Sequence, residues 1–278
     1  MSVKSISSRA LGFLEILQKF LAPWLGVFRI REFVNFLLSF CPLRLKLGGV
    51  VLSIRCWSDC VACLEIFQAH IYDQVFLMDR VQTYCDLGCQ SGFAWLRLTA
   101  LQGAPAESLL VDGNPLAVTR CKKNLSASSS CKIHLIHGVV GWDAEVSGPS
   151  VPFTVRPNEL ECSLAPEPFP HQGSEIIEVP VVNLEKEWLY RIGRRSCDLL
   201  KIDIEGAEGC LLRSEPAFFA RVKRCVLEWH GGTTNKREII SLLKGLGFGE
   251  VKMLWESPRA GVLTCRNLIE ARPSGVKG

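Results

Sequence analysis

The chain has 278 residues, of which 48 % are hydrophobic and 22 % are charged, and its formal net charge is +4. This composition is that of an ordinary globular protein and excludes collagen-like, coiled-coil and disordered chains. The length suits one large domain, or one domain with an appendage. So small a net charge gives no reason to expect a nucleic-acid partner.

The positive charge is concentrated at the start of the chain. Residues 1–60 contain eight bases and three acids, a net charge of +5, which leaves about −1 for the remainder. Apolar residues at helical spacing predict an amphipathic helix over 9–21 and a second apolar helix over 31–40. We expect residues 1–45 to form a helical extension packed on the main domain. A peripheral membrane contact through residues 9–40 and a dimer contact are the alternatives.

The sequence predicts neither a membrane span nor a disulfide framework. The longest uncharged run near the N-terminus, residues 34–43, is about ten residues long, far below the ~20 that a span requires. The thirteen cysteines are an odd number and are scattered along the chain. We interpret most of them as small buried hydrophobes in a reducing compartment, which favours a cytoplasmic protein. An organelle presequence at the N-terminus stays open.

Two strands are expected over residues 45–55, on either side of Gly48 and Gly49. Asp59 then predicts the N-cap of a helix over 61–70. Beyond residue 80, short apolar runs alternate with helical stretches. The runs cover 81–87, 108–112, 132–140, 197–204 and 222–228, and helices are predicted from Gly92, Pro115 and Ala207. This alternation predicts a parallel sheet with helices on both faces.

Two later segments depart from this alternation. Residues 141–175 are rich in proline and glycine and predict a long surface excursion. After a short helix over 237–244, apolar runs at 251–255 and 262–265 are separated by a short loop. They predict a hairpin that adds an antiparallel edge to the sheet.

The strongest local signal lies at the end of the run over 81–87, where Asp86 is followed by Gly88 and Gly92. Glycines at such a turn let the backbone approach a ligand and point its N–H groups at it. The next strand ends in Asp112, an acid placed to bind ribose hydroxyls. A dinucleotide site would need glycine where Gln90 stands. The turn therefore favours a ligand with a ribose but no phosphate, such as S-adenosylmethionine (SAM), and a tight turn without a ligand is the alternative.

Two further strand ends carry ionisable residues. Asp203 and Glu205 follow the run over 197–204, and His230 follows the run over 222–228. Ligands of open α/β sheets bind outside the carboxyl ends of the strands, so these three are the candidate catalytic residues. His230, the one histidine predicted at a strand end on this face, is a natural general base. The alternatives are a structural histidine and a solvated strand-to-helix junction, and the latter suits Glu208.

These motifs, in this order, resemble those of the FkbM family of SAM-dependent methyltransferases. Residues 86–92 are similar to the family's D-x-G-A-N-x-G, and residues 112–115 to its E-P-x-P. Residues 201–208 match K-I-D-V-E-G-A-E with only Ile204 changed. The departures are Cys89, Gln90 and Gly113. The resemblance covers about residues 50–265.

The resemblance implies an α/β fold, the Rossmann-like sheet of class I SAM methyltransferases, with seven mostly parallel strands and an antiparallel last strand. The methyltransferase domain would span 46–278, with its core at about 80–266 and an insert at 141–175. The implied cofactor is SAM, and the implied reaction is O-methylation of a hydroxyl on a saccharide or secondary metabolite, a small-molecule or glycan acceptor. We expect the cofactor-binding residues to be Asp86, Gly88, Gln90, Ser91, Gly92, Asp112, Asn114 and Val139. No metal is expected, and the oligomeric state stays open.

Two other functions remain as alternatives. The basic N-terminus would suit a non-catalytic membrane-associated or partner-binding module on a methyltransferase-like fold. The spacing of Cys56, Cys60 and Cys63 is that of the [4Fe–4S] site of radical-SAM enzymes. However, no barrel pattern follows these cysteines, and Ala62 stands where that family prefers an aromatic residue.

Overall fold

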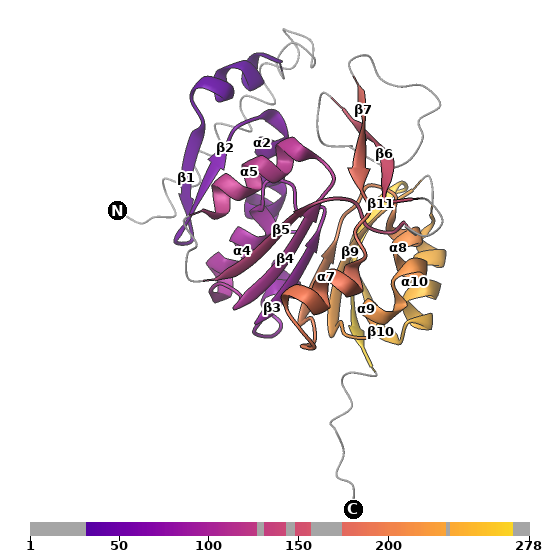
Figure 1. Cartoon of the computed structure of the whole chain (residues 1–278). Coiled ribbons are helices and arrows are strands. Elements are labelled where there is room, and N and C mark those ends of the chain that lie inside the picture. The colour runs from indigo at the N-terminus through magenta and orange to yellow at the C-terminus, as the bar shows by residue number, and fades with distance from the viewer. Residues whose placement is uncertain (1–31, 127–130, 143–147, 157–173, 232–233, 269–278) are drawn as a thin grey trace, which may run out of the picture.

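A seven-stranded sheet forms the centre of the protein (Figure 1). The structure is a computed structural model and describes residues 32–126, 131–142, 148–156, 174–231 and 234–268. The strand order is β10-β11-β9-β8-β3-β4-β5. The strands are β3 (Thr83–Leu87), β4 (Glu107–Asp112), β5 (Lys132–His137), β8 (Leu199–Ile202), β9 (Arg224–His230), β10 (Phe248–Glu256) and β11 (Ala260–Asn267).

Strand direction in the sheet follows the prediction. β5, β4, β3, β8 and β9 pair in parallel, whereas β11 runs antiparallel to both of its neighbours, β9 and β10. The last strand is therefore the antiparallel one, and the expected class I methyltransferase sheet is confirmed. The strand order reverses between β3 and β8, where a doubly wound sheet opens a crevice at the carboxyl ends of its strands.

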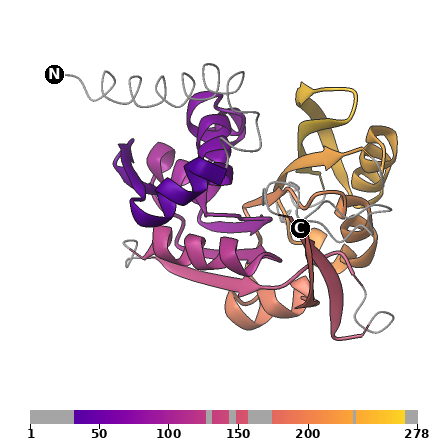
Figure 2. The same cartoon turned by 90° about the horizontal axis from the view of Figure 1, so that it is seen from above.

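Helices cover both faces of the sheet, and Figure 2 shows the two layers from above. The helices are α2 (Trp57–Cys63), the π-helix η1 (Leu64–Gln68), α3 (Asp73–Phe76), α4 (Phe93–Gln102), α5 (Pro115–Leu125), α7 (Leu184–Arg191), α8 (Glu208–Ser214), α9 (Pro216–Phe219) and α10 (Lys236–Gly245). Because successive strand residues point to opposite faces, Tyr84 and Leu110 enter the core beneath α2–α5. Cys85 and Leu109 enter the core beneath α7–α10.

The N-terminal part of the described chain confirms two predictions and corrects a third. Residues 32–40 are helical, and β1 (Leu43–Leu47) pairs with β2 (Val50–Ile54) around the two glycines. Asp59 is not an N-cap, because α2 begins at Trp57 and Asp59 lies fully buried in its first turn. A buried carboxylate needs partners, and Asp59 accepts hydrogen bonds from the Arg55 N–H, at 2.8 Å, and from the Ser91 hydroxyl. The helix predicted over 9–21 lies outside the described residues.

The segment predicted as a surface excursion contains a hairpin. β6 (Ser150–Val155) pairs antiparallel with β7 (Glu175–Pro180), and Val151 and Phe153 are buried on one side of it. Pro152 argued against a strand, but proline is tolerated in a two-stranded ribbon, where its missing N–H faces no neighbour. The prediction of a loop over 141–175 was wrong for these residues. The helix α7 also went unpredicted.

The core tryptophan of α4 offers a test of the packing. Trp95 is fully buried, and its indole N–H donates to Ser108 Oγ at 2.9 Å. Trp95→Ala leaves a cavity and an unpaired hydroxyl, so we expect the free energy of unfolding to fall by about 3–5 kcal/mol. Urea unfolding followed by circular dichroism measures this change. Tyr190→Ala, at a side chain that is 81 % exposed, should change it by less than about 0.5 kcal/mol. Equal losses in both variants would contradict the assignment of this core.

Candidate active site

The glycine turn at residues 88–92 joins β3 to α4 at the crevice. Gly88 has φ of +75°, and a Cβ there would lie 1.7 Å from the Asp203 carbonyl oxygen. Only glycine therefore lets the end of β3 approach the end of β8 so closely.

The backbone of this turn does not point its N–H groups at a ligand. The N–H groups of Gly88 and Cys89 both donate to Val111 O, that of Gln90 donates to Asp112 Oδ2 at 2.7 Å, and that of Gly92 donates to Cys89 O. The prediction of free donors was thus wrong for these four residues, because three of these N–H groups bond to β4 and the fourth bonds within the turn. A turn without such donors is poorly suited to phosphate, which agrees with the expectation of a phosphate-free ligand.

A cavity of about 360 Å³ opens along the carboxyl ends of β3, β4, β8 and β9. This volume lies in the range of small-molecule sites. Five predicted cofactor residues line it: Gly88, Gln90, Asp112, Asn114 and Val139. The other three, Asp86, Ser91 and Gly92, do not line the cavity but lie beneath its wall.

Asp112 is held in place by two backbone donors. Its Oδ1 accepts from the Asn114 N–H at 2.8 Å and its Oδ2 from the Gln90 N–H. Burial raises the pKa of Asp112, and these two hydrogen bonds oppose the rise. A carboxylate offers about four acceptor positions, so Asp112 keeps capacity for ribose hydroxyls. The residues on this side of the cavity therefore fit the adenosine part of SAM.

Ser91 supports the turn from below. Its hydroxyl donates to Asp59, which also lies 3.4 Å from Arg120 Nε. Its carbonyl accepts from Asn124 Nδ2 at 2.8 Å. Through these contacts α2 and α5 fix the turn, so the role of Ser91 in this structure is to position the turn.

Asp86 also supports the glycine turn, through an ion pair with Lys201. The Lys201 ammonium lies 3.3 Å from Asp86 Oδ1 and 3.3 Å from Asp203 Oδ2, and it donates to Gly88 O at 3.2 Å. Burial raises the pKa of Asp86 to about 6, although the charge of Lys201 opposes the rise. Lys201 thereby ties the glycine turn to the end of β8. The sequence marked Lys201 only as part of a motif.

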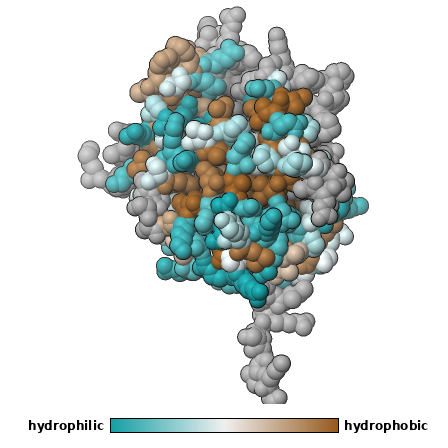
Figure 3. All heavy atoms as spheres, viewed as in Figure 1, coloured by the Kyte–Doolittle hydropathy of each residue, from teal (hydrophilic) through white to brown (hydrophobic). Residues whose placement is uncertain are grey.

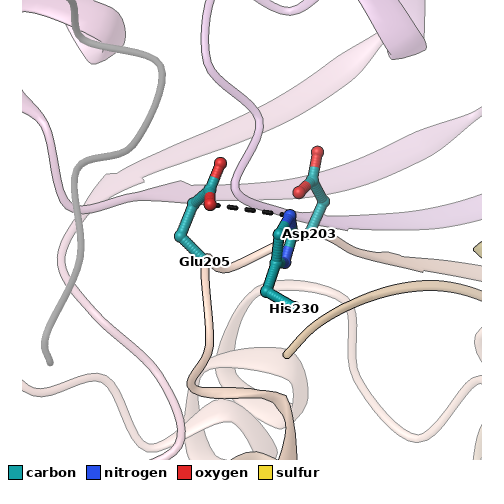
Figure 4. A group of neighbouring side chains, drawn as sticks. All are labelled: Asp203, Glu205 and His230. Atoms are coloured by element: carbon teal, nitrogen blue, oxygen red, sulfur yellow. Dashed lines mark ion pairs between the residues drawn. The ribbon is translucent and has the colours of Figure 1, made fainter. Parts of the chain in front are cut away.

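The three predicted catalytic residues meet at the other end of the cavity (Figure 4). Asp203 and Glu205 follow β8, and His230 ends β9. One side-chain nitrogen or oxygen atom from each residue lies within 4.8 Å of those from the other two. His230 Nε2 lies 3.5 Å from Glu205 Oε2. The structure therefore brings together all three residues that the sequence proposed for catalysis.

Glu208 belongs to the same group, although the sequence suggested a solvated residue. It is fully buried at the start of α8, and its Oε1 lies 3.1 Å from His230 Nδ1. Because a carboxylate only accepts hydrogen bonds, this contact places a ring proton on Nδ1. His230 Nε2 then faces Glu205 and the cavity.

The electrostatics of this group favour protonation. Burial alone would lower the pKa of His230, but the hydrogen bond to Glu208 and the charges of Glu205 and Asp203 raise it to about 10. Burial and neighbouring carboxylates also raise the pKa values of Glu205 and Glu228. At neutral pH these residues therefore hold protons that they release as the pH rises.

Asp203, Glu205 and His230 are also the one group among the described residues whose spacing would suit a metal ion. A metal ion must displace protons from its ligands, and the raised pKa of His230 makes that displacement costly at neutral pH. The raised pKa of His230 therefore disfavours a metal ion at this site near neutral pH. The absence of a metal stays a prediction.

Further residues of the cavity wall were assigned no role from the sequence. Tyr72 and Glu228 line the cavity, and the Tyr72 hydroxyl lies 3.3 Å from Glu228 Oε2. Phe153 of β6 also lines it and packs against Gly113, where a Cβ would approach its ring to 2.8 Å. The departure at Gly113 thus accommodates Phe153. Only a long-range contact could have revealed this pairing.

The prediction that His230 is the one histidine at a strand end needs correction, and the iron–sulfur alternative can be examined in the same way. His137 also ends a strand, β5, so His230 is not the one histidine at this edge of the sheet. However, His137 does not line the cavity, and its Nε2 lies at hydrogen-bond distance, 3.0 Å, from Gly113 O. Cys56, Cys60 and Cys63 do not form a group with metal-ligand spacing in the described chain. Burial raises the pKa values of Cys60 and Cys63 to about 12, so both are thiols. The iron–sulfur alternative therefore has no support here.

The methyltransferase FkbM domain family matches residues 110–249, just over half of the 278 residues. The chain belongs to this family. It is a SAM-dependent methyltransferase, and SAM is its cofactor. The match begins inside β4 and ends inside β10. It therefore includes Asp112 and the four grouped residues Asp203, Glu205, Glu208 and His230. No curated protein matches the chain.

Several solved structures are weakly similar to this FkbM-family chain. A precorrin-6y C5,15-methyltransferase from Geobacter metallireducens shares 12 % identity at a TM-score of 0.41, with 71 % of this chain and 85 % of that one covered. TrmK from M. capricolum, solved with S-adenosylhomocysteine (SAH), shares 9 % identity at a TM-score of 0.43, with 72 % of this chain and 68 % of TrmK covered. A SAM-dependent methyltransferase from Aquifex aeolicus shares 10 % identity at a TM-score of 0.41, with 74 % of this chain and 93 % of that one covered.

The cofactor end of the cavity is tested through Asp112. Asp112→Ala removes the expected partner of the ribose and frees two backbone donors, so we expect SAH to bind about 10–100-fold more weakly. Isothermal titration calorimetry measures this affinity. Asp79→Ala serves as the control, because Asp79 is 53 % exposed beside the amino end of β9. An unchanged affinity in Asp112→Ala would contradict the placement of the ribose.

No helix of the described residues is long and apolar enough to cross a membrane.

Proposed function

We propose that this protein transfers the methyl group of SAM to a hydroxyl oxygen of a saccharide or secondary metabolite in the cytoplasm. The observation that supports this proposal is the group of Asp203, Glu205, Glu208 and His230 at the end of the cavity opposite Asp112. A hydroxyl must lose its proton when it is methylated, and His230 can take that proton once its Nε2 is deprotonated, as happens towards alkaline pH. The free cysteines of the described chain agree with a reducing compartment.

The wall at this end of the cavity suits an acceptor that carries hydroxyl groups. Glu65, Glu205 and Glu228 line it with carboxyl groups, which form hydrogen bonds with hydroxyls in either protonation state. When ionised, the same groups also repel phosphate and other anionic groups. An uncharged small molecule or glycan therefore suits this wall better than a phosphorylated acceptor or a nucleic acid does.

When bound, SAM supplies an electrophilic methyl group on a sulfonium sulfur. Asp112, Asn114 and Val139 would hold its adenosine part, and the glycine turn would support the remainder. Displacement of this kind depends mainly on the alignment of donor and acceptor. The chain achieves alignment through fixed elements, since Lys201 and Ser91 anchor the turn from below.

The proton of the acceptor hydroxyl passes to the pair formed by His230 Nε2 and Glu205. Glu208 holds the ring through Nδ1, so that Nε2 faces the cavity. Glu208 also stabilises the imidazolium that results, as a buried carboxylate does for other catalytic histidines. The proton leaves for solvent as the product departs.

The proposal is tested by incubating the protein with SAM and pools of neutral saccharides and polyhydroxylated small molecules. SAH formation reports turnover, and an O-methyl resonance in the NMR spectrum of the product identifies the atom that was methylated. Methylation of nitrogen, carbon or a nucleic acid in place of oxygen would overturn the proposal.

The role of His230 gives a second prediction. His230→Ala removes the proton acceptor, so turnover should fall about 10²–10⁴-fold. The affinity for SAH should stay within about twofold, because His230 lies away from the adenosine end. Single-turnover kinetics and calorimetry measure the two effects. Normal turnover in this variant would exclude His230 as the base.

The pH dependence gives a third prediction. A base works only when deprotonated, so the raised pKa of His230 should make turnover climb through the alkaline range. Glu205, Glu208, Asp203 and Glu228 all face this histidine, and Glu208 is its hydrogen-bond partner. Glu208→Gln removes one negative charge, so the rising limb should move to lower pH by about 1–3 units, at a lower maximum rate.

A pH–rate profile of the Glu208→Gln variant measures this shift. Glu238→Gln is the matched control, since Glu238 is a surface residue of α10 that pairs with Arg213. If Glu208 were merely structural, Glu208→Gln would lower stability or rate without moving the rising limb.

A further inference from the structure

The helix at residues 32–40 is apolar on both of its faces. Its inner face is anchored to the protein, because Val34 and Leu38 pack against the core and Asn35 Oδ1 accepts from the Trp57 N–H at 2.6 Å. Its outer face consists of four large side chains, which are 54 %, 61 %, 48 % and 77 % exposed: Phe33, Phe36, Leu37 and Phe40.

The spacing of these four residues places them on one stripe of the helix. The rings of Phe36 and Phe40 stack edge to face, with centroids 5.0 Å apart. Single exposed hydrophobic residues are common on soluble proteins, but a contiguous cluster marks an interaction surface. In the space-filling view, apolar atoms gather at the upper left, where Figure 1 draws this helix (Figure 3).

Charge indicates what kind of surface this stripe contacts. Arg29 and Arg31 precede the helix in the sequence, Arg44 and Lys46 follow it on β1 with exposed side chains, and Glu32 is the single acid between them. An apolar stripe flanked by bases is typical of a helix that lies in the headgroup region of an anionic bilayer. A symmetric contact between two copies would instead bring these bases close together.

We propose that helix 32–40 docks the protein on an anionic lipid surface, with Phe33, Phe36, Leu37 and Phe40 inserted among the lipids. The helix is hydrogen-bonded to Trp57 at the start of α2. Ala62 and Glu65, which follow Trp57 in the sequence, line the cavity. Docking would therefore hold one wall of the active site near the membrane. This surface goes beyond the proposed methyl transfer and does not depend on it.

Co-sedimentation of the full chain with lipid vesicles tests the proposal, without SAM or an acceptor. We expect binding to vesicles that contain phosphatidylserine, weak binding to phosphatidylcholine alone, and a loss of binding as salt rises. Phe36→Glu/Phe40→Glu should weaken binding at least tenfold. Tyr190→Glu, on α7 and 81 % exposed, is the matched control and should bind like the unmodified protein.

An unchanged affinity for SAH confirms that each variant is folded. If Phe36→Glu/Phe40→Glu fails this check, Arg44→Glu/Lys46→Glu provides a second test, and it should reduce binding to phosphatidylserine vesicles by about tenfold or more. The proposal is overturned if the unmodified protein binds neither kind of vesicle, or if the folded variants bind as it does. Dimerisation through this face, seen by light scattering without vesicle binding, would also overturn it.

Discussion

The active site depends on one buried cation. Lys201 lies between Asp86 and Asp203, 3.3 Å from each, and bonds the carbonyl of Gly88. It thereby joins the end of β3, the glycine turn and the end of β8 at the point where the strand order reverses. A buried ammonium group without partners would be costly, and so would the buried carboxyl group of Asp86 without it. The cavity floor therefore keeps its shape only while all three groups are present.

The same balance of charge continues towards the acceptor. His230 lies among Glu205, Glu208, Asp203 and Glu228, so its positive charge offsets part of a strongly acidic wall. Asp203 belongs to both arrangements, because it contacts Lys201 and faces His230. The floor that supports the cofactor and the group that accepts the proton are thus one electrostatic unit. A change to Asp203 would disturb both, which makes Glu208 and His230 better probes of the chemistry.

Much of the fold was predictable because it follows from local patterns. Alternating apolar runs identified the parallel sheet, and the closing hairpin identified its antiparallel strand. Asp112, Asp203, Glu205 and His230 were predictable because strand ends converge at one edge. The sequence could not show that Asp59 lies under Ser91, that Glu208 is buried against His230, or that the glycine turn bonds to Val111. Each of these contacts joins residues that are more than twenty positions apart in the sequence, and Asp59 and Glu208 are of polar types that are normally exposed. The strand β6 was missed because Pro152 argued against a strand.

The N-terminal region lies outside the family match at 110–249, yet it completes the site. Asp59 on α2 holds Ser91, and the helix at 32–40 is bonded to the start of the same α2 through Asn35 and Trp57. Two hydrogen bonds, both made to α2, therefore connect the cofactor turn with the back of this helix. Phe36 and Phe40 point away from these contacts, and their exposure shows that they add little to the packing of the core. Docking and methyl transfer are consequently separable. Substitutions on the outer face of the helix should change membrane binding without changing the geometry of the glycine turn.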